Sequence, residues 1–213
     1  LPKENASYFY PSYSTSLVLS DLFPSLVKNS WLTYLKLRGG WAQVGADAGA
    51  YQLQTLYQGS SNKFSGLPLY SLSNTSANAF LKPERTTGTE GGLEVSMFND
   101  RVTLDATYYL KVARDQIMNL TVAPATGFST RAINAGQISN RGVETMVTLK
   151  PVWNRNGLMW STSFNYTRNR NKVDELAPGL STIIIASQWG ANIEARQGEP
   201  YGVIFGYAWK RDP

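Results

Sequence analysis

The feature that most constrains the fold of this chain is an alternation of apolar and polar residues with a period of two. In the stretch RVTLDATYYLK (101–111), every even position is apolar or aromatic, and the odd positions include Asp105 and Lys111. Successive side chains of a β-strand point to opposite faces, so this pattern predicts a strand with one apolar face. The same alternation recurs at residues 33–43, 89–97, 141–150 and 160–169. The sequence therefore predicts an all-β fold.

The composition excludes several classes of function. Charged residues make up only 16% of the chain and aromatic residues 12%, a balance typical of a β-rich surface protein or an outer-membrane barrel. The net charge of +5 comes from scattered Lys and Arg, so no nucleic-acid partner is predicted. The chain has no Cys and no His, which removes thiolate sites and the Ser-His-Asp triad. We predict no catalytic residue, no metal site and no cofactor.

The connections between the predicted strands alternate in length. Strands are expected at residues 7–20, 32–44, 86–97, 102–113, 136–150 and 158–170. Short turns are expected at 98–100 and 151–157, and long connections at 46–84, 114–134 and 172–197. This alternation is typical of an antiparallel transmembrane β-barrel segment with short periplasmic turns and long extracellular loops. Aromatic residues near the first strand fit an interfacial girdle: Tyr8, Phe9, Tyr10 and Tyr13.

The energetics of the two faces favour a membrane barrel over a soluble sandwich or solenoid. A Lys or Arg on the lipid face of a barrel costs about 2–4 kcal/mol near the middle of the bilayer, and the apolar faces here are almost free of charge. The opposite faces are mostly Ser, Thr, Asn and Gly, whereas the water-exposed face of a soluble protein is usually richer in Lys and Glu.

Two alternatives from other classes stay open at this point. A soluble extracellular β-sandwich, such as a carbohydrate-binding module, requires a second sheet over the residues Leu104, Tyr108, Phe164 and Tyr166. A secreted β-rich hydrolase requires two carboxylates about 5–10 Å apart in a cleft, and Asp105 and Glu144 are its leading candidates.

Several stretches together resemble a known family. They are YFYPSYSTSLVLSDLF (8–23), LKLRGGWAQVG (35–45), NAFLKPERTTGTEGGLEVSMFNDRVTLDATYYLKVARDQI (78–117), NAGQISNRGVETMVTLKP (134–151), SFNYTRNRNKVDELAPG (163–179) and GEPYGVIFGYAWKRDP (198–213). In this order they resemble the barrel of TonB-dependent outer-membrane receptors, and specifically the SusC/RagA branch of Bacteroidetes. No plug domain, TonB box or final aromatic-ended strand is recognised. Residues 1–213 are therefore expected to be part of one barrel domain.

The resemblance implies a function and a set of partners. Receptors of this branch sit in the lipid of the outer membrane and import glycan or peptide oligomers together with a SusD-like surface lipoprotein. The TonB complex supplies energy by pulling on the plug. The resemblance thus implies nutrient uptake and no enzymatic activity.

Candidate site residues fall into two groups and one structural block. Polar residues are expected to face the lumen and contact the plug: Lys36, Arg38, Glu90, Glu94, Asp105, Glu144 and Lys150. Loop aromatic residues are expected to face ligand or partner, either by sugar stacking or by packing under a SusD-like lid: Trp189, Tyr201, Phe205, Tyr207 and Trp209. The LKPE block (81–84) is expected to be structural, because Pro83 holds Lys82 extended where a loop enters a strand.

Overall fold

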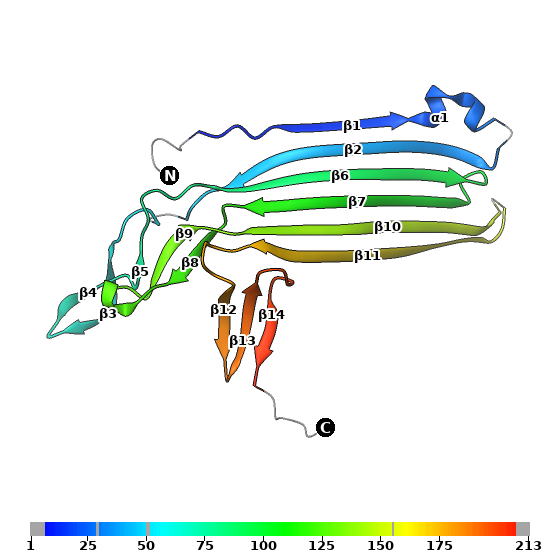
Figure 1. Cartoon of the computed structure of the whole chain (residues 1–213). Coiled ribbons are helices and arrows are strands. Elements are labelled where there is room, and N and C mark those ends of the chain that lie inside the picture. The colour runs from blue at the N-terminus through cyan, green and yellow to red at the C-terminus, as the bar shows by residue number, and fades with distance from the viewer. Residues whose placement is uncertain (1–6, 29, 50–51, 155, 208–213) are drawn as a thin grey trace, which may run out of the picture.

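A six-stranded antiparallel sheet dominates the computed structural model, which describes residues 7–28, 30–49, 52–154 and 156–207 (Figure 1). Its strands follow one another in chain order as a meander: β1 (Ser12–Val18), β2 (Leu32–Ala46), β6 (Glu84–Met97), β7 (Val102–Arg114), β10 (Gln137–Trp153) and β11 (Met159–Glu175). Strands were expected in each of these regions, so the all-β antiparallel prediction is confirmed.

Smaller elements occupy the connections. The β1–β2 connection holds α1 (Leu19–Leu22) and η2 (Pro24–Leu26). The long connections fold into three small sheets at the opposite end of the main sheet (Figure 1). The first sheet pairs β3 (Tyr57–Phe64) with β4 (Leu67–Leu72), and the second contains β5 (Thr75–Ser76), β9 (Thr130–Asn134) and β8 (Ile117–Thr121), with η3 (Pro124–Thr126) between β8 and β9. The third sheet contains β12 (Thr182–Gln188), β13 (Ala191–Arg196) and β14 (Val203–Gly206). Within the described residues, no helix is long and apolar enough to cross a bilayer.

The strand register gives the main sheet two chemically distinct faces. One row of paired positions runs across β2, β6, β7, β10 and β11 and contains only apolar residues: Leu35, Val95, Leu104, Val147 and Phe164. The next row, on the other face, contains Lys36, Glu94, Asp105, Met146 and Asn165. We call these the apolar face and the polar face. The alternation seen in single strands is thus in phase across the whole sheet.

The apolar face has no covering layer in the described part of the chain. Phe164, Tyr166 and Tyr108 are 60%, 57% and 52% exposed. The buried apolar residues instead lie at the loop end: Leu81, Ala132, Ala135, Val173, Leu176, Ala177 and Ala195. A soluble β-sandwich buries one face of each sheet against the other. The residues described here do not do so, which removes the observation that the sandwich alternative requires.

The loop-end core explains how the β12–β14 sheet attaches to the main sheet. Val173 near the end of β11 packs with Leu176 and Ala195, and Leu180 and Ile183 pack against them. Two backbone hydrogen bonds join the same place, because Val173 N donates to Glu199 O at 2.9 Å and Gly198 N donates to Val173 O at 2.8 Å. The small sheet is therefore anchored to the edge strand of the main sheet.

The two short turns differ in how well they were predicted. Residues 98–100 form a tight turn with positive φ angles of 55°, 55° and 62°, which Asn99 and Asp100 tolerate well. The second turn was placed wrongly at 151–157, because β10 continues to Trp153 and the turn closes where Asn154 N donates to Leu158 O at 3.1 Å. Pro151 lies where the register shifts between Leu149 and Val152. A proline without an N–H group is accommodated in a strand at such a bulge.

Position 142 on the polar face requires a glycine, because atoms of Tyr109 and Arg168 approach its backbone closely. Its backbone is buried, and a Cβ there would lie 2.5 Å from Tyr109 Oη and 2.7 Å from Arg168 O. Tyr109 lies across this position and donates from Oη to Asn169 Oδ1 at 3.3 Å.

Gly142→Ala is therefore expected to destabilise the barrel by about 1–3 kcal/mol, the usual cost of forcing an extra methyl into a packed site. Gly91→Ala is the matched control, since a Cβ at Gly91 meets nothing within 4 Å. Denaturant unfolding of the lipid-reconstituted receptor measures both variants. Equal stability of the two variants would contradict the close packing of Tyr109 over Gly142.

Candidate functional site

The polar face gathers most of the charged residues that sequence analysis singled out. Six of them lie on this face by register: Lys36 and Arg38 on β2, Glu90 and Glu94 on β6, Asp105 on β7 and Glu144 on β10. These six residues come from four adjacent strands, so one surface carries both signs of charge.

Arg38 and Asp105 form the strongest contact of this surface. Arg38 Nη1 and Nη2 donate to Asp105 Oδ2 and Oδ1 at 2.9 and 2.6 Å, and Nη2 also donates to Thr107 Oγ1 at 2.5 Å. Both side chains are about one-third exposed, at 34% and 30%. Bidentate guanidinium–carboxylate pairs fix orientation as well as charge. Asp105 is therefore committed to Arg38, and the hydrolase alternative loses one of its two leading acids.

Gly92 explains how the Arg38 side chain can reach across the neighbouring strand to Asp105. Arg38 lies on β2 and Asp105 on β7, with β6 between them. A Cβ at Gly92 on β6 would lie 2.5 Å from Arg38 Nε. The missing side chain thus provides the channel through which the guanidinium crosses β6.

The remaining charges of the group behave differently from one another. Lys36 Nζ lies 3.5 Å from Glu94 Oε2. Glu90 and Glu144 make no ion pair with any described residue. Lys150 was expected to partner a carboxylate, but its Nζ lies 5.1 Å from the centroid of the Trp153 ring near the turn end. Among the described residues, ion pairs therefore join four of these seven side chains: Lys36 with Glu94, and Arg38 with Asp105.

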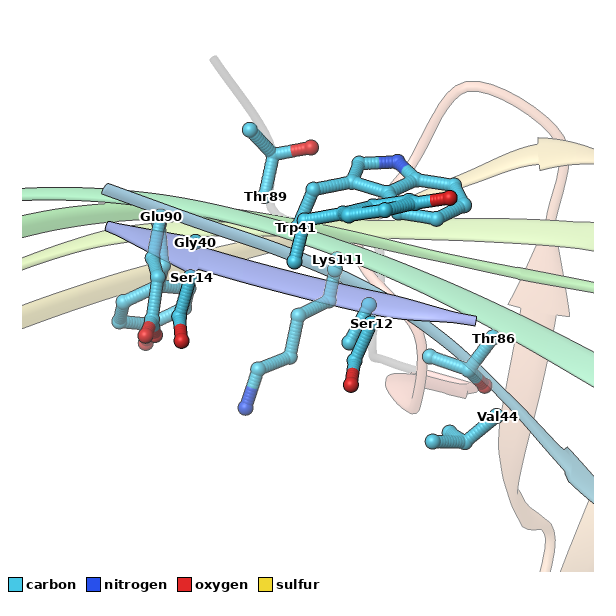
Figure 2. Close-up of a pocket in the computed structure, with 13 residues that line it drawn as sticks. Ser12, Ser14, Gly40, Trp41, Val44, Thr86, Thr89, Glu90 and Lys111 are labelled. Atoms are coloured by element: carbon cyan, nitrogen blue, oxygen red, sulfur yellow. The ribbon is translucent and has the colours of Figure 1, made fainter. Parts of the chain in front are cut away.

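A shallow cavity of about 360 Å³ lies on the first four strands of the sheet (Figure 2). In Figure 2, Ser12, Ser14, Glu90 and Lys111 point to one side of the strands, and Trp41 points to the other. Trp41 stacks on Tyr13 with ring centroids 5.9 Å apart. Sequence analysis assigned no site role to Ser12, Ser14, Tyr109 or Lys111, although they line this cavity and the same alternation places them on the polar face.

The loop aromatic residues do not form a single group. Trp189, in the β12–β13 turn, and Tyr207, after β14, are 97% and 99% exposed. They lie at the same tip, since Ala191 pairs with both Gln188 and Gly206.

The other predicted aromatics lie elsewhere. Tyr201 is near the main sheet, where its N–H donates to Asn171 Oδ1 at 2.9 Å. The guanidinium carbon of Arg196 lies 3.1 Å from the centroid of the Phe205 ring. Trp209 falls outside the described residues.

The middle strand of the same small sheet holds a buried carboxylate. Glu194 is 5% exposed, and it accepts hydrogen bonds from Arg196 Nε at 2.7 Å and from Asn192 Nδ2 at 3.1 Å. The Arg196 guanidinium, aided by Asn192, holds the pKa of Glu194 below its usual range. A lowered carboxyl pKa stabilises the folded state above the ordinary pKa, and this contribution is lost as the pH falls through the lowered value.

Sequence analysis missed an asparagine clamp that connects three loop segments. Asn134 Oδ1 accepts from Lys82 N at 2.7 Å, and Asn134 Nδ2 donates to Lys82 O at 2.6 Å and to Asp115 O at 2.8 Å. Next to it, Leu81 is fully buried and Glu84 Oε1 accepts from Ile117 N at 2.9 Å. These contacts join Lys82 and Glu84 of the LKPE block (81–84) to Asn134 and Ile117 of the same chain. The only sequence feature that pointed to this residue was the family resemblance, because the stretch 134–151 begins at Asn134.

Comparison with known proteins gives a consistent family. A family model described as TonB-dependent receptor-like β-barrel matches residues 3–211. TonB-dependent receptor P39 of Formosa agariphila is 32% identical over 83% of this chain, and SusC of Bacteroides thetaiotaomicron is 28% identical over 70%. The chain covers 16% and 15% of these two relatives.

The fold comparison agrees with the sequence comparison. A structure of the RagAB peptide transporter superposes on 93% of this chain with a TM-score of 0.78 at 22% identity, and the match covers 21% of that protein. Members of this family are outer-membrane receptors and transporters rather than enzymes. The chain belongs to the TonB-dependent receptor β-barrel family, is similar within it to SusC, shares its fold with the RagAB transporter, and lies in the outer membrane.

Proposed function

We propose that this chain forms part of the barrel wall and the extracellular loops of a TonB-energised importer. The observation that carries the proposal is the main sheet itself, whose six strands present one polar face and one apolar face that no described residue covers. Lipid covers the apolar face, and the polar face lines the lumen. The long connections, which fold at one end of the sheet, form the outer surface.

The lumen face supplies contacts for the plug. Opposite charges neutralise each other within the Arg38–Asp105 pair and within the Lys36–Glu94 pair. Glu90 and Glu144 have no ion-pair partner among the described residues, and so they offer carboxylates to a neighbouring surface. In this proposal the plug of the complete receptor contacts them, and the TonB complex acts on the plug. The wall itself is passive, and residues 1–213 are one part of a single barrel domain without catalytic residues.

The substrate class in this proposal is an oligosaccharide or a peptide oligomer. SusC is a relative by sequence, and the RagAB structure is described as a peptide transporter. The exposed pair Trp189 and Tyr207 offers flat apolar faces that suit either sugar rings or peptide side chains. A SusD-like surface lipoprotein is the proposed partner at this loop end.

A paired substitution tests the proposal in cells that produce the complete receptor. Trp189→Ala combined with Tyr207→Ala is expected to weaken substrate binding at least about tenfold, equivalent to ~1.4 kcal/mol. Trp153→Ala is the matched control, because this half-exposed tryptophan lies at the turn end. Uptake of labelled oligosaccharides and peptides is measured with and without TonB. Uptake that persists without TonB would contradict the proposed function.

A further inference from the structure

A group of four cations interrupts the apolar face at its loop end. Arg141 on β10 lies directly opposite Arg170 on β11, and Arg168 and Lys172 lie two positions to either side of Arg170. Because side chains of one strand alternate between faces, all four share the face of Val143, Tyr166 and Phe164. All four are exposed. We call Arg141, Arg168, Arg170 and Lys172 the basic cluster.

The basic cluster is not neutralised within the described part of the chain. The ion pairs formed there use four other cations: Lys36, Arg38, Arg85 and Arg196. Asp174 is close by, but it forms no ion pair with the cluster among the described residues, and its single negative charge stands against four positive charges. Like charges directly opposite on neighbouring strands are destabilising. The Arg141–Arg170 pair is therefore expected to hold an anion between its guanidinium groups.

A groove lined by both Arg141 and Arg170 is the proposed position of this anion. A cavity of about 390 Å³ is lined by Leu110, Ser139, Arg141, Arg170, Asn171, Lys172, Asp174, Gly198 and Pro200. Three of its lining side chains are cationic and one is a carboxylate, so the local balance is positive. Guanidinium groups match the geometry of phosphate oxygens, which they bind in a bidentate manner.

The surface next to the cluster indicates what the anion is attached to. Continuing from the cluster along the same face toward the turn end, the side chains are apolar and open: Tyr108, Val143, Tyr166 and Phe164 are 52%, 37%, 57% and 60% exposed. An anionic group on the cluster thus has an apolar surface directly beneath it. A phosphorylated lipid presents this combination, with a charged headgroup joined to acyl chains.

We propose that the basic cluster binds the phosphate of the lipid A moiety of lipopolysaccharide in the outer leaflet, with its acyl chains along Tyr166 and Phe164. The proposal rests on the orientation given under the proposed function, in which the apolar face meets lipid and the loop end is extracellular. Charge complementarity selects a lipid with a net negative phosphate headgroup over a zwitterionic phospholipid, whose phosphate is balanced by its own cation. The lipid becomes a specific annular ligand of the wall between β10 and β11.

Native mass spectrometry of the complete receptor in detergent tests this site. The wild-type receptor is expected to retain added lipid A at least about tenfold better than dephosphorylated lipid A. This comparison needs no variant, so it is independent of folding defects. Equal retention of the two lipids overturns the proposal. Displacement of lipid A by millimolar inorganic phosphate also overturns it, because the site would then be one for free phosphate.

A charge-matched pair of variants locates the site. Arg141→Gln, Arg170→Gln and Lys172→Gln together are expected to abolish the preference for lipid A. The control removes three exposed cations elsewhere, Lys28→Gln, Lys63→Gln and Arg131→Gln, and is expected to keep it. Equal lipid A retention by both variants overturns the assignment. TonB-dependent uptake by the wild-type receptor is a separate readout, so its absence would count against the proposed function and not against this site.

Discussion

Replacing Val147 by lysine is expected to destabilise the receptor by about 2–4 kcal/mol, the cost of a cation on the lipid face near the middle of a bilayer. Val147 lies in the all-apolar row of the main sheet between Leu104 and Phe164. A lysine there has no carboxylate on its own face in that row and must lose its hydration in lipid. Denaturant titration of the receptor folded into lipid vesicles measures the change in unfolding free energy.

The matched control is the adjacent residue, Met146→Lys. Met146 is 45% exposed on the polar face and lies opposite Asp105 and Asn165. A lysine at this position meets water and a nearby carboxylate, so the expected change is within about 0.5 kcal/mol. If both lysines cost the same, the distinction between the two faces fails.

Asn134→Ala is the second substitution with a large expected effect, a loss of about 2–4 kcal/mol. The change removes three hydrogen bonds and leaves the Lys82 amide and the Lys82 and Asp115 carbonyls without their partner. Each hydrogen bond contributes about 1 kcal/mol, and the bond to Asp115 O lies in a partly buried position. Leu81, which is fully buried beside the clamp, is expected to become accessible. Limited proteolysis between residues 78 and 84, together with unfolding titration, measures the effect.

Asn119→Ala is the control for this prediction. Asn119 is exposed on β8 in the same small sheet as Asn134, and its side chain makes no hydrogen bond to any described residue. It is expected to leave both stability and cleavage unchanged. Unaltered proteolysis in the Asn134 variant would show that the clamp does not hold the LKPE block.

The parts of the fold that could be predicted depend on local pattern. Alternation within one strand fixes which residues share a face, and the antiparallel meander keeps neighbouring strands in phase. Lys36, Glu94 and Asp105 could therefore be assigned to one face without knowing any distance. The tight turn at 98–100 was also predictable, because Asn and Asp adopt positive φ angles more readily than most residues.

The parts that escaped prediction depend on contacts between distant residues. Asn134 binds Lys82 across 52 residues, which no local pattern records. Arg38 pairs with Asp105 rather than with its neighbouring strand, because Gly92 leaves space for the side chain to cross. Trp189 and Tyr207 come to the same tip through the pairing of β12, β13 and β14. The strands β12 and β13 lie in the stretch 172–197, which was predicted to be a long connection.

The bulge in β10 is a further feature that could not be predicted from the sequence. A proline usually ends a central strand, so Pro151 indicated the start of a turn. In the structure the register shifts between Leu149 and Val152, and the ladder resumes with Val152 opposite Trp160. Local chemistry identified an interruption correctly but could not distinguish a bulge from a turn.

Spin labelling on both faces tests the lipid-exposed wall most directly. The chain contains no cysteine, so Leu104→Cys and Phe164→Cys on one face and Met146→Cys and Asn165→Cys on the other each introduce one label into this segment. Labels at residues 104 and 164 should collide frequently with oxygen and rarely with a water-soluble nickel complex, and those at 146 and 165 should not show this preference. If labels at 104 and 164 are shielded from both reagents, protein rather than lipid covers the apolar face, and the account is contradicted.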